Sequence, residues 1–128
     1  MANPNIVNVT TIYGNTSTNL ISTTADPFAT ALVSNAASSG KVYKINSIVA
    51  ANIDGTSAVD ITIKIFSQAA IAGTGTAIAS TISVPADATL IITDKTTSFY
   101  LLEDKSIGAT AGIANDIVVT CSWEEINS

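Results

Sequence analysis

The fold is decided by an eight-residue stretch, VDITIKIF, at residues 59–66. Apolar and polar side chains alternate along it, with the apolar set at Val59, Ile61, Ile63 and Ile65. Successive side chains of a strand point to opposite faces, so this alternation predicts a β-strand with one face in a core and the other in water.

A second segment of period two precedes it at residues 42–53, with one face carrying Tyr43, Ile45, Val49 and Ile53. The sequence DGTS at residues 54–57 joins the two segments. Asp-Gly is a strong signal for a tight turn, because glycine accepts a positive φ. The sequence therefore predicts that residues 42–53 and 59–66 pair as a β-hairpin.

The rest of the chain continues in short segments of the same kind. Strands are expected at residues 6–13, 20–24, 28–33, 77–84, 89–94, 99–102, 106–111 and 116–126, with a loop or short helical turn at 69–75 and an extended N-terminal arm at 1–5. In the segment 77–84, Ile78, Ile82 and Val84 form the apolar face.

Eight to ten short strands at this spacing are typical of a sandwich or a small barrel. Two packed sheets are favoured, because a single sheet of this length would leave one apolar face uncovered. We therefore expect residues 1–128 to form one all-β domain, an antiparallel β-sandwich of the jelly-roll type.

The composition excludes several classes of function. The 128 residues include no His, no Arg and a single Cys, and ten carboxylates outweigh five Lys to give a net charge of −5. The commonest neutral-pH base, the bidentate phosphate clamp and a Cys-based zinc site are therefore missing, and binding to nucleic acid is not expected. The chain shows neither a secretory signal nor an apolar run long enough to span a membrane.

What the chain has in excess is β-branched and small polar residues. Val, Ile and Thr make up 45 residues, whereas charged residues are 12%, about half of the usual share of roughly 25%. The surface must therefore consist largely of Thr, Ser, Asn and Ala, a composition that suits contact with other subunits better than chemistry.

The candidate catalytic groups are weak. Ser106 follows Lys105, but neighbours on a strand point to opposite faces, so a Ser–Lys pair is poorly placed. The adjacent carboxylates Glu103-Asp104 and Glu124-Glu125 fall in a predicted turn and near the C-terminus, where solvated charge is the simpler interpretation. The sequence predicts no catalytic residue and no enzyme.

Candidate ligand loops are equally weak. Asn52-Ile53-Asp54-Gly55 lacks the later acids of a calcium loop, and Gly73-Thr74-Gly75 lacks the Gly-Lys-Ser/Thr and the helix of a phosphate loop. The Thr-x-Thr pairs at Thr16/Thr18 and Thr74/Thr76 share no fixed period. We expect no metal and no cofactor.

Trp123 is the sole tryptophan, in the sequence CSWEE at residues 121–125. Exposed, it could be a platform on which a glycan stacks. Its alternation with Val119 and Cys121 favours packing in the fold instead, with Cys121 as a small buried hydrophobic residue.

Four stretches carry a resemblance over most of the chain. They are TIYG at residues 11–14, LVSN at 32–35 with SSGKVYKIN at 38–46 and VAANIDGT at 49–56, SVPADATL at 83–90, and YLLEDKSI at 100–107 followed by CSWEEI at 121–126. In these stretches the chain resembles small virion structural proteins of tailed phages, especially marine and cyanobacterial phages. It departs from them at Glu103-Asp104-Lys105, where Glu-Gly-Asp is usual, and at Trp123, where Tyr is common.

The resemblance implies a non-enzymatic component of the phage particle, assembled in the host cytoplasm. A capsid decoration protein that reinforces the head is the first expectation, with copies of itself and the major capsid protein as partners in a symmetric homo-oligomer. A neck, tail or fibre component is the alternative within the particle. Outside the particle, the alternative is a carbohydrate-binding adhesin module.

Overall fold

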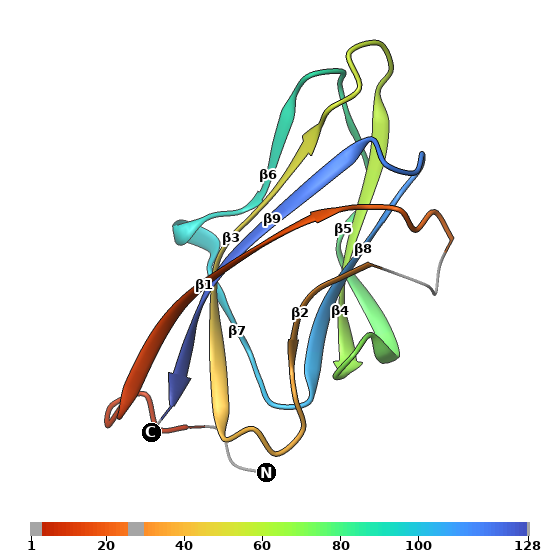
Figure 1. Cartoon of the computed structure of the whole chain (residues 1–128). Helices are drawn as coiled ribbons and strands as arrows, with labels where there is room; N and C mark the ends of the chain where they lie inside the picture. The colour runs from red at the N-terminus through yellow and green to blue at the C-terminus, as the bar shows by residue number, and fades with distance from the viewer. Residues whose placement is uncertain (1–3, 26–29, 128) are drawn as a thin grey trace.

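The computed structural model describes residues 4–25 and 30–127, and within them the chain is almost entirely β-structure (Figure 1). Its strands are β1 (Thr11–Leu20), β2 (Thr30–Asn35), β3 (Lys41–Asn52), β4 (Val59–Gln68), β5 (Ala72–Val84), β6 (Thr89–Thr93), β7 (Phe99–Leu101), β8 (Lys105–Ala111) and β9 (Ile117–Asn127). A single turn of 3-10 helix, η1 (Lys95–Thr97), separates β6 from β7. No helix in the described ranges is long and apolar enough to cross a membrane.

The strands form two antiparallel sheets, which lie as two layers in Figure 1. Sheet A has the order β1-β9-β3-β6, with β7 also paired to β3, and sheet B has the order β2-β8-β4-β5. This arrangement confirms the predicted all-β sandwich.

The pairing is that of a long hairpin rolled up on itself. The first strand pairs with the last (β1 with β9), the second with the last but one (β2 with β8), β3 with β6 and β7, and β4 with β5 at the tip. Alternate pairs of this hairpin belong to alternate sheets. This is jelly-roll topology, and it confirms the expectation from the sequence.

The core lies between the sheets. The inward faces of β4 and β8 contribute Ile61, Ile63, Ile107 and Ala109, and sheet A contributes Ile45, Ile48, Val119 and Cys121, all buried. The apolar set read from residues 59–66 is therefore the core face, with Ile65 half-buried at its end.

The predicted hairpin at residues 54–57 is wrong. β3 and β4 are both strands, but β3 pairs within sheet A and β4 within sheet B, so the Asp-Gly segment carries the chain across the sandwich. A turn signal marks where the chain reverses; it does not specify whether the flanking strands pair with each other.

Buried asparagines hold this crossing and the one before it. At the end of β3, the Asn52 amide donates to the carbonyl oxygens of Ser57 and Val84, both at 2.9 Å, and its Oδ1 accepts from Asp54 N at 2.9 Å. At the end of β2, Asn35 donates to the carbonyls of Lys41 and Leu101 and accepts from the Ser39 hydroxyl. Each crossing loop is thus tied to both sheets.

The predicted inward face of β3 is correct only at its start. A β-bulge between Ile45 and Ser47 changes the alternation, so Ile48 and Ala50 point inward, Val49 points outward, and Ile53 is 57% exposed. An extra residue in a strand shifts every later side chain to the other face, which a strict period of two cannot anticipate.

The apolar face predicted for residues 77–84 is correct only at Val84. Ala79 and Val84 are the buried positions of β5, whereas Ile78 and Ile82 remain substantially exposed, because this edge strand carries several register shifts against β4. β5 also begins at Ala72, so the predicted loop at 69–75 is confined to Ala69–Ile71.

The N-terminal segment differs as well. The first strand begins at Thr11 rather than at residue 6, and it runs through Leu20, so the weak strand expected at 20–24 is absent from the described residues. The expected strand at 28–33 begins in residues outside the described ranges and appears from Thr30 as β2. Of the predicted arm at 1–5, only residues 4 and 5 are described.

Candidate functional site: the outer face of sheet A

The candidate catalytic serine has a structural role. The Ser106 side chain is buried, donates to the carbonyl oxygen of Gln68 at 2.7 Å and accepts from Ile71 N at 2.9 Å. Lys105 Nζ donates to the carbonyl oxygen of Ser67. Both residues fasten the β4–β5 turn to sheet B, and in the described part of the chain the hydrogen bonds of the Ser106 hydroxyl go to backbone groups rather than to a base.

The first carboxylate pair lies in the turn before β8. Asp104 Oδ1 accepts from Ala69 N at 3.0 Å, which again holds the β4–β5 turn, and the Glu103 side chain is largely buried. The expectation of a solvated turn is therefore wrong for Glu103.

The second pair is split between two faces of β9. Glu125 faces inward, where it contacts the Asn15 amide, forms an ion pair with Lys41 at 3.4 Å and accepts a hydrogen bond from Tyr43. Glu124 faces outward and accepts from the Asn46 amide at 3.2 Å. Neighbouring strand residues diverge, so the two carboxylates cannot act together on one ligand.

The candidate ligand loops are stabilised internally. Asp54 Oδ1 accepts from the backbone N and the hydroxyl of Thr56, and these hydrogen bonds lower the pKa of its carboxyl group. Gly73 and Gly75 belong to β5, and Thr74 N donates to the Ser67 hydroxyl. The described residues contain no group of three or more potential metal ligands of the Cys or carboxylate type.

Trp123 packs against the core and is not free on the surface. It faces inward from β9, is half-buried, and its ring stacks on that of Tyr43 with centroids 6.2 Å apart. Burial, followed by the charge and hydrogen bond of Glu125, raises the pKa of Tyr43 to about 12. The packing interpretation is thus confirmed, and one face of the indole ring is unavailable to a ligand.

Cys121, two residues earlier, lies fully inside the core. Burial raises the pKa of its thiol to about 12. A thiol that stays protonated at neutral pH is a poor nucleophile, so Cys121 serves as a small apolar side chain.

The outer face of sheet A is the surface that stands out. We call it the A-face and define it by the outward-pointing residues of its strands: Gly14, Thr16, Thr18 and Leu20 on β1, Val118, Thr120, Ser122 and Glu124 on β9, Lys44, Ser47, Val49 and Ala51 on β3, Thr89 and Ile91 on β6, and Tyr100 on β7. These residues include one acid and one base. Ile91 is 62% exposed.

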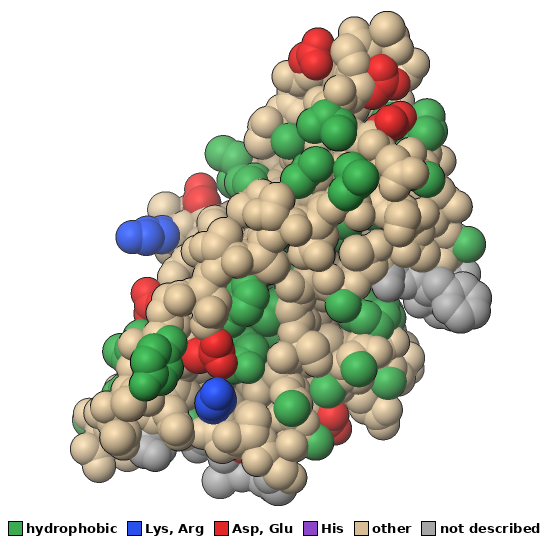
Figure 2. All heavy atoms as spheres, in the orientation of Figure 1, with side chains coloured by type: hydrophobic (Ala, Val, Ile, Leu, Met, Phe, Trp, Pro, Cys, Tyr) green, Lys and Arg blue, Asp and Glu red, His purple; other side chains and the backbone are tan. Residues whose placement is uncertain are grey.

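The A-face is graded from one end to the other. Around Leu20, Val118 and Ile91 it is aliphatic, in the middle it carries hydroxyl groups, and the two charges lie together further along. In Figure 2, hydrophobic side chains gather over the region where β3, β6 and β9 run in Figure 1, and charged side chains there are few. A depleted charge content with exposed aliphatic groups is typical of the core of a protein interface.

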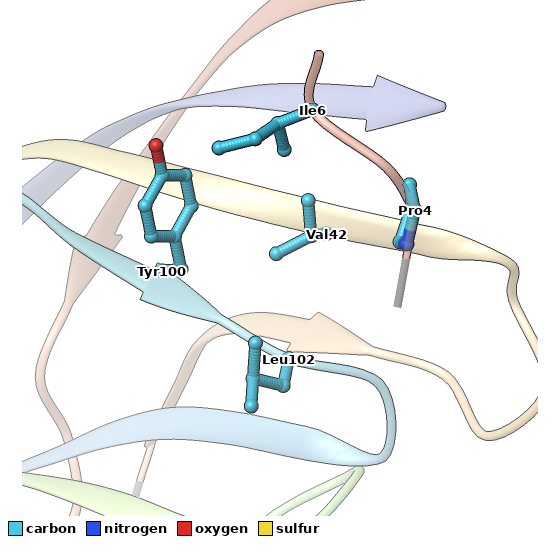
Figure 3. Close-up of a pocket in the computed structure, with 5 residues that line it drawn as sticks. All are labelled: Pro4, Ile6, Val42, Tyr100 and Leu102. Atoms are coloured by element: carbon cyan, nitrogen blue, oxygen red, sulfur yellow. The ribbon is translucent and has the colours of Figure 1, made fainter. Parts of the chain in front are cut away.

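Beyond the charged pair, residues 4–7 fold back onto the same side of sheet A. Pro4 and Ile6 lie over Val42, Tyr100 and Leu102 around a shallow apolar hollow of about 180 Å³ (Figure 3). Val42 is buried although it lies outside the main core, because this segment covers it. The described part of the predicted arm therefore packs on its own subunit.

The outer face of sheet B is different. β4 presents Asp60, Thr62 and Lys64 there, and a small hollow beside them is lined by Thr24, Thr81 and Thr110. This part of the face is polar and suited to water. The contrast makes the A-face the best candidate for a functional surface.

Sequence reasoning missed the A-face, although part of the signal was present. Alternation along β9 sets Val118 and Thr120 opposite the core residues Val119 and Cys121. The corresponding residues of β3 and β6 could not be aligned with them without the bulge near Asn46 and the pairing of β3 with β6. No protein-family model matches the chain, and no curated protein matches it either.

Proposed function

We propose that this chain is a non-enzymatic structural protein of a tailed-phage particle, and that it decorates the capsid and reinforces the head. The observation that carries the proposal is the A-face, an extended and nearly uncharged surface on a jelly-roll sandwich. Jelly rolls are common in viral capsid domains, but also in lectins and cupins. The topology therefore supports the proposal without deciding it.

The proposed mechanism is mechanical. Copies of the chain and the major capsid protein are the partners, and each contact is weak. Repetition over a symmetric shell turns weak contacts into a strong hold, because a subunit bound at one point meets its next contact at high effective concentration. A pre-formed, bulged sheet offers such contacts with little loss of conformational entropy.

Mass spectrometry of purified particles tests the proposal, and quantitative gel densitometry against the major capsid protein determines the copy number. Decoration predicts hundreds of copies per particle. A few copies or a few dozen would move the chain to the neck, the tail or a fibre. Its absence from purified particles would overturn the structural role.

A carbohydrate-binding adhesin module is the second candidate. The observation in its favour is Tyr13, 62% exposed on β1 next to the contact between Asn15 and Glu125. An exposed aromatic ring beside an amide and a carboxylate could hold a sugar. A glycan array probed with the wild type and with Tyr13→Ala tests it: signals that disappear in the variant would support this candidate, and silence of the wild type would reject it.

A further inference from the structure

The A-face is complementary to itself when its residues are read in rows across the strands. Each row runs from β1 through β9 and β3 to β6 or β7, and the outward residues of a row lie side by side in register. The row nearest the folded-back segment is Gly14, Glu124, Lys44 and Tyr100.

This row is complementary to a second copy of itself that runs in the opposite order. In that arrangement, Tyr100 of one copy lies opposite Gly14 of the other, and Lys44 lies opposite Glu124. The acid then meets the base, and the aromatic ring meets the residue that has no side chain. A Cβ added to Gly14 would meet no atom within 4 Å, so the space above it is open.

The two charged side chains of this row also form no ion pair within their own subunit, among the residues described. Among the residues that the structure describes, the Lys44 ammonium has no ion-pair partner, and Glu124 accepts only from the neutral Asn46 amide. A charge of each sign is thus available for a partner on an otherwise neutral surface.

The aliphatic rows behave in the same way. Thr18, Thr120, Val49 and Ile91 form one row, and reversal sets Ile91 against Thr18 and Val49 against Thr120. In these two rows, reversal thus sets Ile91 and Tyr100 against smaller residues and Lys44 against its opposite charge, while Val49 meets a side chain of equal size.

Reversal of a row corresponds to one symmetry operation. A two-fold axis that lies in the interface, parallel to the strands and midway between β9 and β3, places β9 of one copy over β3 of the other and β1 over β6 and β7. Packed sheets keep their strands within about 30° of each other, which such an axis permits. The partner this geometry fits is a second copy of the chain.

The surface is of modest size. Its rows run from Gly14 to Leu20, seven residues at roughly 3.4 Å per residue, across four strands about 4.8 Å apart, so it covers about 460 Å² on each subunit. Stable interfaces bury about 800 Å² per partner, so this area suits a weak dimer. We propose that the A-face is an isologous homodimer interface in which Lys44 of each copy pairs with Glu124 of the other.

The test uses the full-length chain in solution, with association measured by sedimentation velocity. Like charges placed across an interface oppose association strongly. Lys44→Glu sets Glu against Glu at both contacts, and Glu124→Lys sets Lys against Lys, so each variant alone should associate at least about tenfold more weakly than the wild type. When the two variants are mixed, every contact is again a Glu–Lys pair, and a heterodimer should form.

Matched controls carry the same charge changes elsewhere. Lys95→Glu on η1 and Asp60→Lys on the outer face of sheet B should dimerise like the wild type. A monomeric wild type at high concentration would overturn the proposal, as would singly charged variants that still dimerise or a mixture that stays monomeric. Circular dichroism confirms that each variant is folded.

This proposal names the partner within the proposed structural role but does not depend on the phage particle. Dimerisation of the isolated chain tests the A-face, whereas detection in particles tests the role. If the chain dimerises but is absent from particles, the proposed interface is supported and the proposed function is overturned. If the chain is monomeric in solution but present in hundreds of copies per particle, the function is supported and the interface is overturned.

Discussion

At the scale of single residues, the thiol of Cys121 makes the stability of the fold sensitive to alkaline pH. Its pKa rises from 9.0 to about 12 because the side chain is buried. The folded state therefore keeps the thiol proton where the unfolded state loses it. The stabilisation is complete below pH 9 and is lost as the pH rises from 9 toward 12, at up to about 1.4 kcal/mol per pH unit.

Urea denaturation at pH 8, 9, 9.5 and 10 checks this prediction. Cys121→Ala should lower stability by a constant amount through the small cavity but flatten the decline between pH 9 and 10. Tyr43, whose pKa is raised from 10.0 to about 12, adds its own decline only above pH 10. Parallel slopes for the wild type and Cys121→Ala would contradict the assignment.

Trp123 contributes to stability through its ring rather than its indole N–H. Its Nε1 is buried and has no hydrogen-bond partner among the described residues, whereas the ring packs on the core and on Tyr43. Trp123→Ala should cost about 3 kcal/mol, the lower end for a buried aromatic, because the site is half-buried. Trp123→Phe should cost less than about 1 kcal/mol, since it keeps an aromatic ring and removes an unpaired donor.

Denaturant midpoints followed by circular dichroism measure both variants, because each removes the only tryptophan signal. If Trp123→Phe were as damaging as Trp123→Ala, the indole N–H would have a partner that matters. Trp123 was also the residue on which the sequence was most informative: its alternation with Val119 and Cys121 predicted the packed face correctly.

At the scale of elements, two of the crossings between the sheets, from β2 to β3 and from β3 to β4, depend on buried asparagines. Asn52→Ala would leave the Ser57 and Val84 carbonyls and the Asp54 amide without their partner, and should destabilise the protein by about 2–4 kcal/mol. Asn46→Ala, which loses one half-exposed contact with Glu124, is the matched control and should cost less than about 1 kcal/mol. Equal midpoints for the two variants in urea would show that the crossing is held by other contacts.

The elements also show why sequence reasoning reached the fold class but not the topology. The alternation of apolar and polar residues correctly identified the core-facing side chains of β4 and β9, because it depends only on residues that are near in sequence. The partner of β3 depends on whether the chain after Asn52 turns back along the same sheet or crosses the sandwich, and the amide of Asn52 makes three contacts that no local pattern contains. The A-face was missed for the same reason, because it assembles residues from five strands.

At the scale of the whole molecule, the rolled hairpin places the first and last strands side by side. Thr11 pairs with Asn127 and Leu20 with Val118, so closure of sheet A must bring together nearly opposite ends of the chain. Chains dominated by such non-local contacts fold in about milliseconds to seconds. We expect folding to begin where loop closure is cheapest, at the β4–β5 hairpin, and β1 to dock onto β9 late.

Two conservative variants at fully buried positions separate these stages. Ile63→Val on β4 and Ile21→Val, just after β1, should each cost about 0.5–1.5 kcal/mol at equilibrium. If β4 and β5 pair early, Ile63→Val lowers the folding rate and leaves the unfolding rate nearly unchanged. Ile21→Val should instead speed unfolding, because its contacts form after the rate-limiting step. Stopped-flow fluorescence of Trp123 measures both rates, and a slower folding rate in Ile21→Val with none in Ile63→Val would place closure of the chain ends before the tip of the hairpin.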